Sequence, residues 1–424
     1  MERLKIAVIG GGSVFTPELI TCLRDNRPAL GPMDVRLMDI DTDRLEIIRS
    51  FCARLLGGSN NDIKLSATHD VAEAVKGCAF VLLQLRQGGQ DMRILDEKLG
   101  KKHRIPFVET VSICGFSTFL RTYYEFERLI PIILENAPGA WVMNFTNPAG
   151  QLTEMLSGQG IDRVVGVCNG WIGMRETISR LSGLPVDAFF MNWRGLNHLT
   201  FTDAIYDSSG QNILPGLLNK LSDDQEYFPF DPSLMRTLGC FPNSYMQYYY
   251  NRRKMIDKLQ KQDRVRSEVV KELDGELLKL YKTAESIPDS LKKRGGFGYS
   301  GAVVSILKGI WCDEGSIHYA VTKNHNALGC LPDDAMIECP VIAKKSGVYP
   351  VNTGDLPEFA RPIAITIKAY ERMAIRAAKE RNRDMLLTSM MMHPLIGDYS
   401  IAKPMLEECL DMNRNYIPKP LWPQ

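Results

Sequence analysis

The feature that most constrains the fold of this 424-residue chain is a cluster of three glycines, Gly10 to Gly12, directly after an apolar run. That run, Leu4–Gly10, has only Lys5 as a polar residue, which is typical of a β-strand covered by helices on both faces. A tight glycine turn between a strand and a helix lets backbone N–H groups face a pyrophosphate. The start of the chain therefore predicts the first βα unit of a dinucleotide-binding domain.

The glycine cluster by itself leaves the ligand open, because a glycine turn before a helix also occurs for structural reasons alone. Phe15 occupies the place of the third glycine in the GxGxxG pattern. If the turn binds a dinucleotide, we expect Gly10, Gly12 and Ser13 to face its phosphates.

Asp39 ends the second predicted strand. A carboxylate at this point can accept hydrogen bonds from both ribose hydroxyls of an adenosine, and it would repel a 2′-phosphate. The alternative role is a helix N-cap, which Asp41 or Thr42 could equally provide. Together with the glycine turn, Asp39 favours NAD over NADP and is predicted to bind the cofactor.

The first half of the chain alternates short apolar runs with amphipathic stretches, which is the pattern of successive βα units. The predicted strands are Leu4–Gly10, Val35–Ile40, Ala79–Leu85, Pro106–Glu109, Trp141–Phe145 and Arg163–Val167. The predicted helices include Pro17–Asn26, Leu45–Leu56, Met92–His103 and Thr118–Asn136. The pattern predicts an α/β fold, a Rossmann-type doubly wound parallel sheet like that of lactate and malate dehydrogenases, over residues 1–187.

The alternation weakens from about Ala188, and residues 188–424 are predicted to form a second, α+β domain for substrate and metal binding and for oligomerisation. Strands are expected in Trp193–Tyr206 and in His318–Val351. Long helices are expected over Met255–Lys282, Ser300–Trp311 and Ile363–Met392.

Composition gives no reason to expect a nucleic acid or a membrane as a partner. The 51 basic and 50 acidic residues give a net charge of +1, and no apolar stretch approaches the ~18 residues that span a bilayer. The N-terminus shows no export signal, since Lys5 interrupts a short apolar run. The ten cysteines form no CxxC pair, so we expect reduced thiols in a cytoplasmic protein.

Polar residues follow several predicted strands, at the edge where open α/β sheets place their active sites. Asn147 follows one strand, and Cys168 with Asn169 ends the next. His198 comes soon after, at the start of the second half. A thiolate and an imidazole brought together can hold a divalent metal and leave positions open for substrate oxygens. The alternatives are a packing cysteine and a core histidine.

Tyr245 lies in an aromatic cluster that spans residues 242–250. Such a cluster is more often part of a core or an interface than of an active site. A tyrosine beside a cation can nevertheless act as a base, because the positive charge lowers its pKa.

Taken together and in this order, these segments resemble glycoside hydrolase family 4, and within it the 6-phospho-β-glucosidases. The resemblance runs nearly from end to end of the chain. It rests on GGGSVFTPELI at Gly10–Ile20, LMDID at Leu37–Asp41, QLRQGGQDMRILDEK at Gln84–Lys98, AWVMNFTNPAGQLTE at Ala140–Glu154, GVCNGWIG at Gly166–Gly173, GLNHLTF at Gly195–Phe201, PNSYMQYYY at Pro242–Tyr250, RSEVVKEL at Arg266–Leu273, KRGGFGYS at Lys293–Ser300 and IECPVIAKKSG at Ile337–Gly347.

The resemblance implies hydrolysis of a β-glucoside, which we expect to be 6-phosphorylated, through a transient oxidation, an exception to two-carboxylate glycosidase chemistry. NAD takes hydride from C3 of the sugar, which makes the proton on C2 acidic. A tyrosine removes that proton, the group on C1 leaves, water adds, and C3 is reduced again. A divalent metal on the C2 and C3 oxygens stabilises the developing charge.

The same resemblance implies roles for individual residues. Cys168 and His198 match the family's metal ligands, most often for manganese, and Tyr245 matches the base that removes the C2 proton. Arg93 and Asn147 match substrate-binding positions.

Arg266 matches the family's substrate-binding arginine, a natural partner for a sugar phosphate, although the spacing from Tyr245 leaves Arg264 possible. The alternative for both arginines is a solvated helix face. Asn169 stands where the α-specific members carry a general-acid Asp. Since Asn has no titratable proton to donate, Asn169 favours a β-glycoside as substrate.

The loop Val108–Phe116 departs from the GQETTGPGG-like loop of the family, because only Glu109, Thr110 and Gly115 fit that pattern. This leaves two alternatives to a phosphorylated β-glucoside: the same mechanism on an unphosphorylated or uronic-acid glycoside, or a net NAD-dependent 2-hydroxy-acid dehydrogenase. Family members commonly associate, so we expect a homodimer or a homotetramer.

Overall fold

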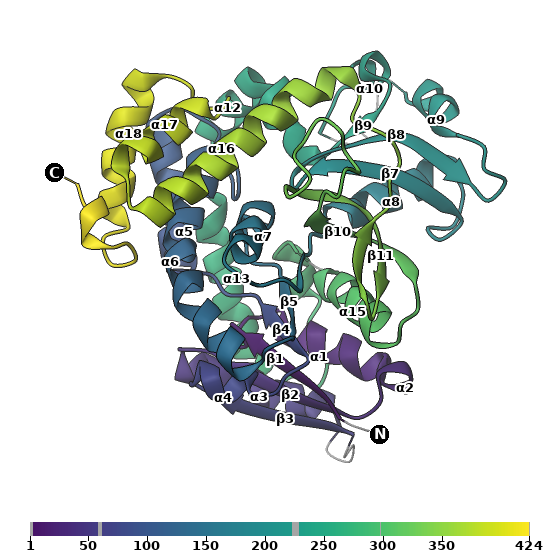
Figure 1. Ribbon diagram of the computed structural model, residues 1–424, viewed down its shortest axis with the longest axis vertical. Coiled ribbons are helices and arrows are strands. Elements are labelled where there is room, and N and C mark those ends of the chain that lie inside the picture. The colour runs from purple at the N-terminus through teal and green to yellow at the C-terminus, as the bar shows by residue number, and fades with distance from the viewer. Residues whose placement is uncertain (1–2, 58–61, 223–228, 297, 424) are drawn as a thin grey trace.

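The computed structural model describes residues 3–57, 62–222, 229–296 and 298–423. Six parallel strands form one half of its sheet, in the order β3-β2-β1-β4-β5-β6 (Figure 1). Their bounds are β1 Leu4–Ile9, β2 Met33–Met38, β3 Ile63–Thr68, β4 Phe80–Leu83, β5 Trp141–Asn144 and β6 Val164–Gly166. This is the strand order of dinucleotide-binding Rossmann domains, so the predicted fold class is confirmed.

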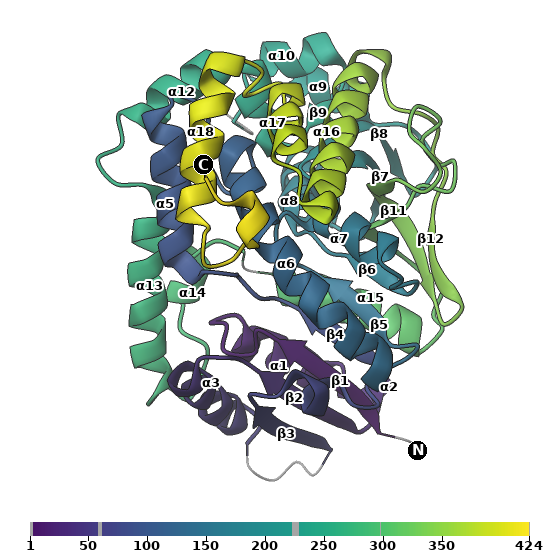
Figure 2. The ribbon, with the colours of Figure 1, turned by 60° about the vertical axis from the view of Figure 1, so that its left-hand side comes forward.

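Helices cover both faces of the parallel strands, which explains why β1, β4 and β5 are almost wholly apolar (Figure 2). One layer contains α1 Thr16–Asp25, α3 Thr42–Leu55 and α15 Tyr299–Trp311. The opposite layer contains α4 Val71–Val75, α6 Ser112–Asn136 and α7 Ala149–Gly158. A short helix, α2 Arg27–Leu30, precedes β2.

The second half of the chain extends the same sheet with antiparallel strands. These are β10 Ser316–Lys323, β11 Met336–Lys344, β7 Phe189–Leu196, β8 Leu199–Asp207 and β9 Phe241–Pro242, with β12 Gly347–Pro350 paired to β11. The two halves join where Val321 of β10 pairs with Gly166 of β6. A Cβ on Gly166 would lie 2.8 Å from Val321 Cβ, so this junction requires a glycine.

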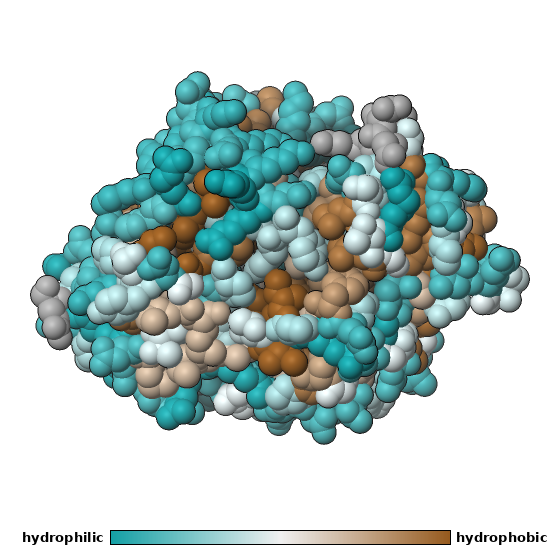
Figure 3. Space-filling view, turned by 90° about the horizontal axis from the view of Figure 1, so that it is seen from above, coloured by the Kyte–Doolittle hydropathy of each residue, from teal (hydrophilic) through white to brown (hydrophobic). Residues whose placement is uncertain are grey.

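The remaining helices surround the antiparallel strands and the upper part of the molecule in Figure 1. They are α5 Gly89–Lys102, α8 Gly170–Ser182, α9 Leu214–Lys220, α10 Pro232–Leu238, α11 Gln247–Tyr250, α12 Arg252–Gln260, α13 Arg266–Tyr281, α14 Ser290–Lys293, α16 Arg361–Glu380, α17 Arg383–Met392 and α18 Tyr399–Met412. The face seen from above is mainly hydrophilic, with apolar residues visible in separate areas (Figure 3). Within the described ranges, no helix is both long and apolar enough to cross a membrane.

The predicted strand Pro106–Glu109 is wrong, because this segment is a turn between α5 and α6. Its apolar residues were mistaken for a strand, but they fill the space between the two helices: a Cβ on Gly100 would lie 2.6 Å from Phe107 Cβ. The sequence pattern also missed β3, an edge strand in which only Ile63 is buried.

Two predicted helices are each divided in two. The stretch Met255–Lys282 is interrupted between α12 and α13, and Ile363–Met392 is interrupted between α16 and α17. At the second break Arg381 has φ +53°, and the Asn382 side chain then accepts a hydrogen bond from the N–H of Met385. The chain thus starts a new helix with its own cap, which the continuous apolar pattern conceals.

Candidate active site

The glycine turn after β1 packs against the backbone of its neighbouring strands. Gly10 has φ +89°, and a Cβ on it would lie 2.9 Å from the backbone of Gln84. The N–H groups of Gly10 and Gly11 both donate to Met38 O, at 2.9 and 2.8 Å. The turn is therefore fixed by hydrogen bonds to β2, and its first position requires glycine.

Asp39 closes the turn from the other side. Its Oδ2 accepts from the N–H of Gly12 at 2.9 Å, and its Oδ1 accepts from the N–H of Asp41 at 3.1 Å. The cap of α3 is provided by Asp41, whose Oδ1 accepts from the N–H of Arg44 at 3.0 Å. Asp39 is thus not the cap of α3, and each of its carboxylate oxygens keeps a lone pair for a further donor.

A single cavity of about 660 Å³ begins at this turn and extends along the carboxyl ends of the parallel strands. All of the predicted site residues except Gly12 line it: Gly10, Ser13, Asp39, Arg93, Asn147, Cys168, Asn169, His198, Tyr245 and Arg266. We call the part around Gly10–Ser13 and Asp39 the glycine end, and the part around Cys168, His198 and Tyr245 the cysteine end. The fold brings together residues that lie up to 256 positions apart, from Gly10 to Arg266.

Cys168 and His198 face the cysteine end from two loops. Cys168 follows β6, is buried, and accepts a hydrogen bond from the N–H of Gly170 at 3.4 Å. Burial raises the pKa of its thiol, the Glu338 carboxylate adds to this, and hydrogen bonds from Gly170 and Asn197 oppose it. A cation would therefore have to displace the thiol proton in order to bind there.

His198 lies in the two-residue turn between β7 and β8, with φ +63°. Its Nδ1 is 2.6 Å from Thr110 Oγ1, so Nε2 is the nitrogen left for a metal. Burial lowers the pKa of His198 to about 4, against the opposing charge of Glu109, so the ring is a neutral imidazole at pH 7. A neutral imidazole is the form that binds metals.

The described residues contain no group of three or more His, Cys, Asp and Glu side chains placed to hold a metal. A cation at Cys168 and His198 would thus keep several coordination positions for water or for substrate oxygens, as a catalytic metal site requires. Asn147 strengthens this fit, because its Oδ1 is buried without a hydrogen-bond partner beside the same cavity.

Tyr245 stacks on His198, with ring centroids 4.1 Å apart and an interplanar angle of 11°. It lies on a short 3-10 helix, Ser244–Met246, that Asn243 begins by accepting a hydrogen bond from the N–H of Tyr245 at 3.0 Å. Burial raises the pKa of the Tyr245 phenol, and the nearby Glu109 carboxylate adds to this. A cation at the cysteine end would act in the opposite direction and favour the phenolate.

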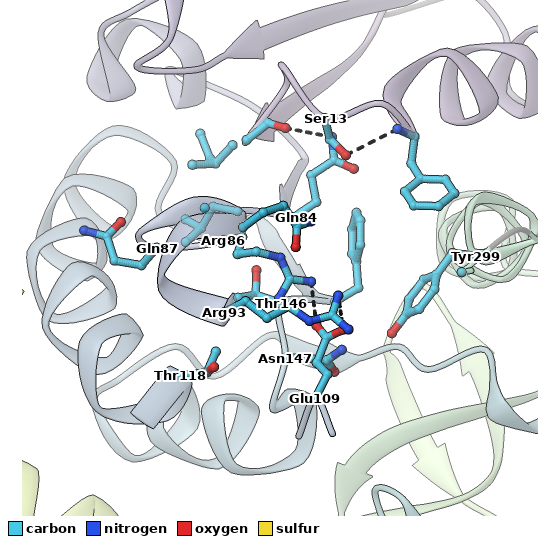
Figure 4. A pocket seen from close by; sticks show the side chains of 18 of the residues that line it. Ser13, Gln84, Arg86, Gln87, Arg93, Glu109, Thr118, Thr146, Asn147 and Tyr299 are labelled. Carbon is cyan, nitrogen blue, oxygen red and sulfur yellow. Dashed lines mark hydrogen bonds and ion pairs between the residues drawn. The ribbon is translucent and has the colours of Figure 1, made fainter. Parts of the chain in front are cut away.

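A cluster of charges occupies the middle of the cavity (Figure 4). Glu109 pairs with Arg86 and, at 3.1 Å, with Arg93, which also donates to Glu97 at 2.9 Å. Burial would raise the pKa of Glu109, but the two arginines hold it well below its usual range. Glu109 is therefore a permanent anion that fixes the direction of Arg93.

Arg266 and Arg264 lie in different surroundings. Arg266 opens α13, donates to Lys293 O at 2.9 Å and lines the cavity. Arg264 pairs with Glu272 on the surface and does not line it. Of the two arginines that the spacing allowed, the structure thus brings only Arg266 to the cavity.

The unusual residues of the loop 108–116 point away from the main cavity. Val111, Ile113 and Cys114 are buried in the core, at 4%, 0% and 1% exposure, and none of the three lines the cavity. Only Glu109 of this loop does so. The departure from the family pattern therefore changes the packing behind the site more than the surface that faces a ligand.

Sequence reasoning missed some residues of this site as functional candidates. Arg86 and Tyr299 line the cavity, Glu109 and Thr110 orient its side chains, and Glu338 lies behind it. Glu338 offered a readable signal, since a charged residue in the middle of the apolar run 336–343 needs a buried partner. Thr110 offered none, because its contact with His198 joins residues 88 positions apart.

The fold and the cavity define the class: an α/β enzyme with a dinucleotide site at one end and a thiol–imidazole pair at the other. The model of the family 4 glycosyl hydrolases matches residues 5–184, and the model of the C-terminal domain of the same family matches residues 193–396. The chain belongs to family 4 of the glycosyl hydrolases.

Individual relatives agree over nearly their full lengths. The chain is 32% identical over 419 residues to the 6-phospho-β-glucosidase BglT of Thermotoga maritima, with 98% of this chain and 99% of the relative covered. It is 30% identical over 440 residues to a 6-phospho-β-glucosidase of Escherichia coli, with 98% and 97% covered. A solved structure of the T. maritima enzyme with manganese, NAD+ and glucose-6-phosphate is similar with a TM-score of 0.91 at 30% identity, covering 98% of this chain and 99% of that one.

A lactate dehydrogenase from a deep-sea metagenome library is similar in fold, with a TM-score of 0.56 at 15% identity, covering 89% of this chain and 100% of that chain. This likeness concerns the fold alone, and it confirms the prediction of a dehydrogenase-like Rossmann sheet.

Proposed function

We propose that this protein hydrolyses a 6-phosphorylated β-glucoside with the help of NAD and a divalent cation, for which manganese is the first candidate. The observation that carries the proposal is the single cavity that joins the glycine turn and Asp39 to Cys168, His198 and Tyr245. Solved relatives named 6-phospho-β-glucosidases, with NAD, manganese and glucose-6-phosphate in their structures, support it.

Each part of the cavity has a task in this reaction. When bound, NAD accepts and returns a hydride, and the cation polarises the sugar oxygens beside the carbon that loses its proton. Cys168 and His198 would hold the cation, and Asp39, whose direction is fixed by the N–H of Gly12, would hold the adenosine end of NAD. The buried Asn147 Oδ1, which lacks a partner, would accept a hydrogen bond from a sugar hydroxyl.

Tyr245 would take the proton from C2 of the sugar. Burial alone keeps the phenol protonated, and a cation at the cysteine end would lower its pKa and favour the phenolate, which is the form that accepts a proton. The His198 ring stacked on it fixes its direction. Arg266, Arg93 or both would bind the phosphate, because a guanidinium offers paired donors and a permanent charge.

Asn169 lies at the start of α8, lines the cavity and makes no capping hydrogen bond. An amide at this position can hydrogen-bond a hydroxyl or a water but cannot protonate a leaving group. This supports a β-glycoside whose leaving group departs with the help of water.

The test is release of nitrophenol from p-nitrophenyl 6-phospho-β-glucoside, with NAD and Mn²⁺ under reducing conditions. Release that requires both additions and the phosphate is the expected result. Activity only on the plain glucoside or the uronic-acid glycoside would overturn the proposed substrate, and steady accumulation of NADH with a 2-hydroxy acid would overturn the hydrolase reaction.

We also propose a cytoplasmic location and a homo-oligomer. All ten cysteines are free thiols, which supports a reducing compartment. Light scattering of the purified protein tests the second point, and a monomer at all concentrations would contradict it.

A further inference from the structure

Glu338 is a carboxylate enclosed in the centre of the sheet. It lies on β11, is 0% exposed, and sits where β11 pairs with Gly195 of β7 and with Val321 of β10. Two other buried carboxylates have a cation beside them, since Asp96 pairs with Arg121 and Asp274 pairs with Arg294. Glu338 forms no such ion pair with any of the described residues, and its partners are neutral donors.

These donors all come from the strand and turn that carry His198. Glu338 Oε1 accepts from Trp193 Nε1 at 2.8 Å, and Oε2 accepts from Asn197 Nδ2 at 2.8 Å. The backbone N–H of His198 faces the same carboxylate and acts to lower its pKa. The turn between β7 and β8 is thus bonded to Glu338 through the side chain of Asn197.

This turn needs hydrogen bonds from other elements to stabilise it, because it has an unfavourable backbone conformation. His198 has φ +63°, a region that residues other than glycine seldom adopt, and no local side-chain bond within the turn compensates for it. The carboxylate of Glu338 bonds the side chain of Asn197 in this turn, while Thr110 Oγ1 lies 2.6 Å from Nδ1 of the His198 ring.

Asn197 also bonds the loop that carries Asn147. Its Oδ1 accepts from the N–H of Gly150 at 3.4 Å, at the start of α7, and a Cβ on Gly150 would lie 2.9 Å from Asn197 Cβ. Asn147, whose Oδ1 lacks a partner, precedes this helix by two residues. One side chain therefore links the His198 turn to the Asn147 loop.

We propose that Glu338 is a positioning residue for the metal site: through the side chain of Asn197 it holds the turn that carries His198, and with it the imidazole, in the direction that binds the cation. It does so from outside the ligand set, since no cluster of three candidate ligands exists among the described residues. The inference rests on the proposed function, because it assumes a cation at Cys168 and His198.

The variant Glu338→Gln tests this inference. Glutamine has one acceptor oxygen instead of two, so its amide group would face a donor and one of the ties would be lost. Changes to residues that orient metal ligands typically weaken metal affinity by about 10- to 100-fold. We expect that loss in the dissociation constant of Mn²⁺, measured from the free Mn²⁺ signal by electron paramagnetic resonance in the presence of NAD.

Glu18→Gln is the matched control. Glu18 is also buried, and it also accepts from neutral donors, Gly298 N and Ser300 Oγ, both at 2.8 Å, but it lies on α1 and bonds no residue of the β7–β8 turn. We expect this variant to bind Mn²⁺ within twofold of the wild type, even if it unfolds at a lower temperature. Equal weakening in both variants would show a general packing effect and overturn the inference.

Asn197→Ala is the second variant, useful if Glu338→Gln does not fold. It removes the bridging amide from a partly exposed position, and we expect it to weaken Mn²⁺ binding as Glu338→Gln does. The double variant should lose little more Mn²⁺ affinity than either single variant, because both changes break the same hydrogen bond between Asn197 and Glu338. Fully additive losses would overturn the inference.

Cys168→Ser separates this inference from the proposed function. If the wild type shows no Mn²⁺ binding that depends on Cys168, the proposed function fails and the inference fails with it. If Cys168→Ser abolishes binding while folded Glu338→Gln binds Mn²⁺ like the wild type, only the inference is overturned.

Discussion

The two ends of the main cavity are built in different ways. At the glycine end, hydrogen bonds from backbone N–H groups to a carbonyl and to one carboxylate hold the turn, and the partners lie within two adjacent strands and their turns. At the cysteine end, the contacts are between side chains of separate elements. Thr110 precedes α6, Cys168 follows β6, His198 lies in the β7–β8 turn, and Tyr245 lies beyond β9.

The difference separates two kinds of function. A backbone turn binds a phosphate group through fixed dipoles and depends on space, so a single added methyl group should disturb it. Buried side chains change their proton affinity with their surroundings, as His198 and Tyr245 do, so this end can move protons and hold a cation. We therefore expect variants of the glycine end to change NAD affinity, and variants of the cysteine end to change rate and metal affinity.

The largest effect is expected for Tyr245→Phe. The phenylalanine ring keeps the stacking on His198 but removes the proposed base, so kcat for p-nitrophenyl 6-phospho-β-glucoside should fall about 10³-fold. The dissociation constants of NAD and Mn²⁺, measured by fluorescence and by electron paramagnetic resonance, should stay within threefold. A variant with more than a tenth of the wild-type kcat would contradict the role of Tyr245.

Arg266→Ala and Arg264→Ala form a pair two positions apart. Loss of a charged hydrogen bond to a phosphate costs about 1.5–3 kcal/mol, so Arg266→Ala should lower kcat/KM about 10- to 100-fold. Arg264→Ala should have little effect, because Arg264 pairs with Glu272 on the surface. The comparison is made on phosphorylated and plain glucosides, and an equal loss on both would rule out phosphate binding by Arg266.

Gly12→Ala tests the glycine end. A Cβ at this position would lie 2.8 Å from Asp39 Oδ2, so Asp39 must turn away and lose the bond from the N–H of Gly12. The dissociation constant of NAD should rise about tenfold, which corresponds to about 1.4 kcal/mol, while Mn²⁺ affinity stays unchanged.

Gly158→Ala is the control for that change, since nothing lies within 4 Å of a Cβ at this position in α7. It should leave NAD affinity as it is. If Gly12→Ala instead weakens Mn²⁺ binding as much as NAD binding, the division into two independent ends is wrong.

The last prediction concerns stability instead of activity or affinity: the acid sensitivity of the fold near the cysteine end. His393 lines a smaller cavity behind His198 and Tyr245, and burial, with Arg252 adding to it, lowers the pKa of His393 to about 3. An unfolded histidine has a pKa of about 6.5. Between these values the unfolded state binds a proton that the folded state does not. The free energy of unfolding should therefore fall as the pH is lowered, by up to about 1.4 kcal/mol per pH unit for this one group.

Urea unfolding at pH 7, 6 and 5 measures this slope. In His393→Asn the amide oxygen can still accept from the N–H of Leu395, which is 3.1 Å from Nδ1 in the wild type, and the slope should become shallower. A slope identical to that of the wild type would show that His393 is not neutral in the folded protein.

Much of the parallel sheet could be predicted, because its strands are apolar runs bounded by turns. The failures have a common cause: the pattern of hydrophobic residues does not state what an apolar side chain packs against. Pro106, Phe107 and Val108 are apolar because they pack between α5 and α6, and β3 carries Lys64, Ser66 and Thr68 because it lies at the edge of the sheet. The hydrophobic pattern also runs through the two helix breaks, at Lys261–Val265 and at Arg381, and so does not reveal them.

The sequence by itself determined the family and the fold class, because these depend on contiguous motifs and on their order; the roles of residues at both ends of the cavity stay predictions. Only the tertiary structure decided that Asp41 caps α3, that Arg266 reaches the cavity, and that Glu338 lies under the His198 turn. The physical reason is the range of the interactions. A turn is stabilised by hydrogen bonds to its neighbours in sequence and in the adjacent strand, whereas the environment of His198 comes from Thr110 and Glu338, which lie 88 and 140 positions away and meet it only in the folded chain.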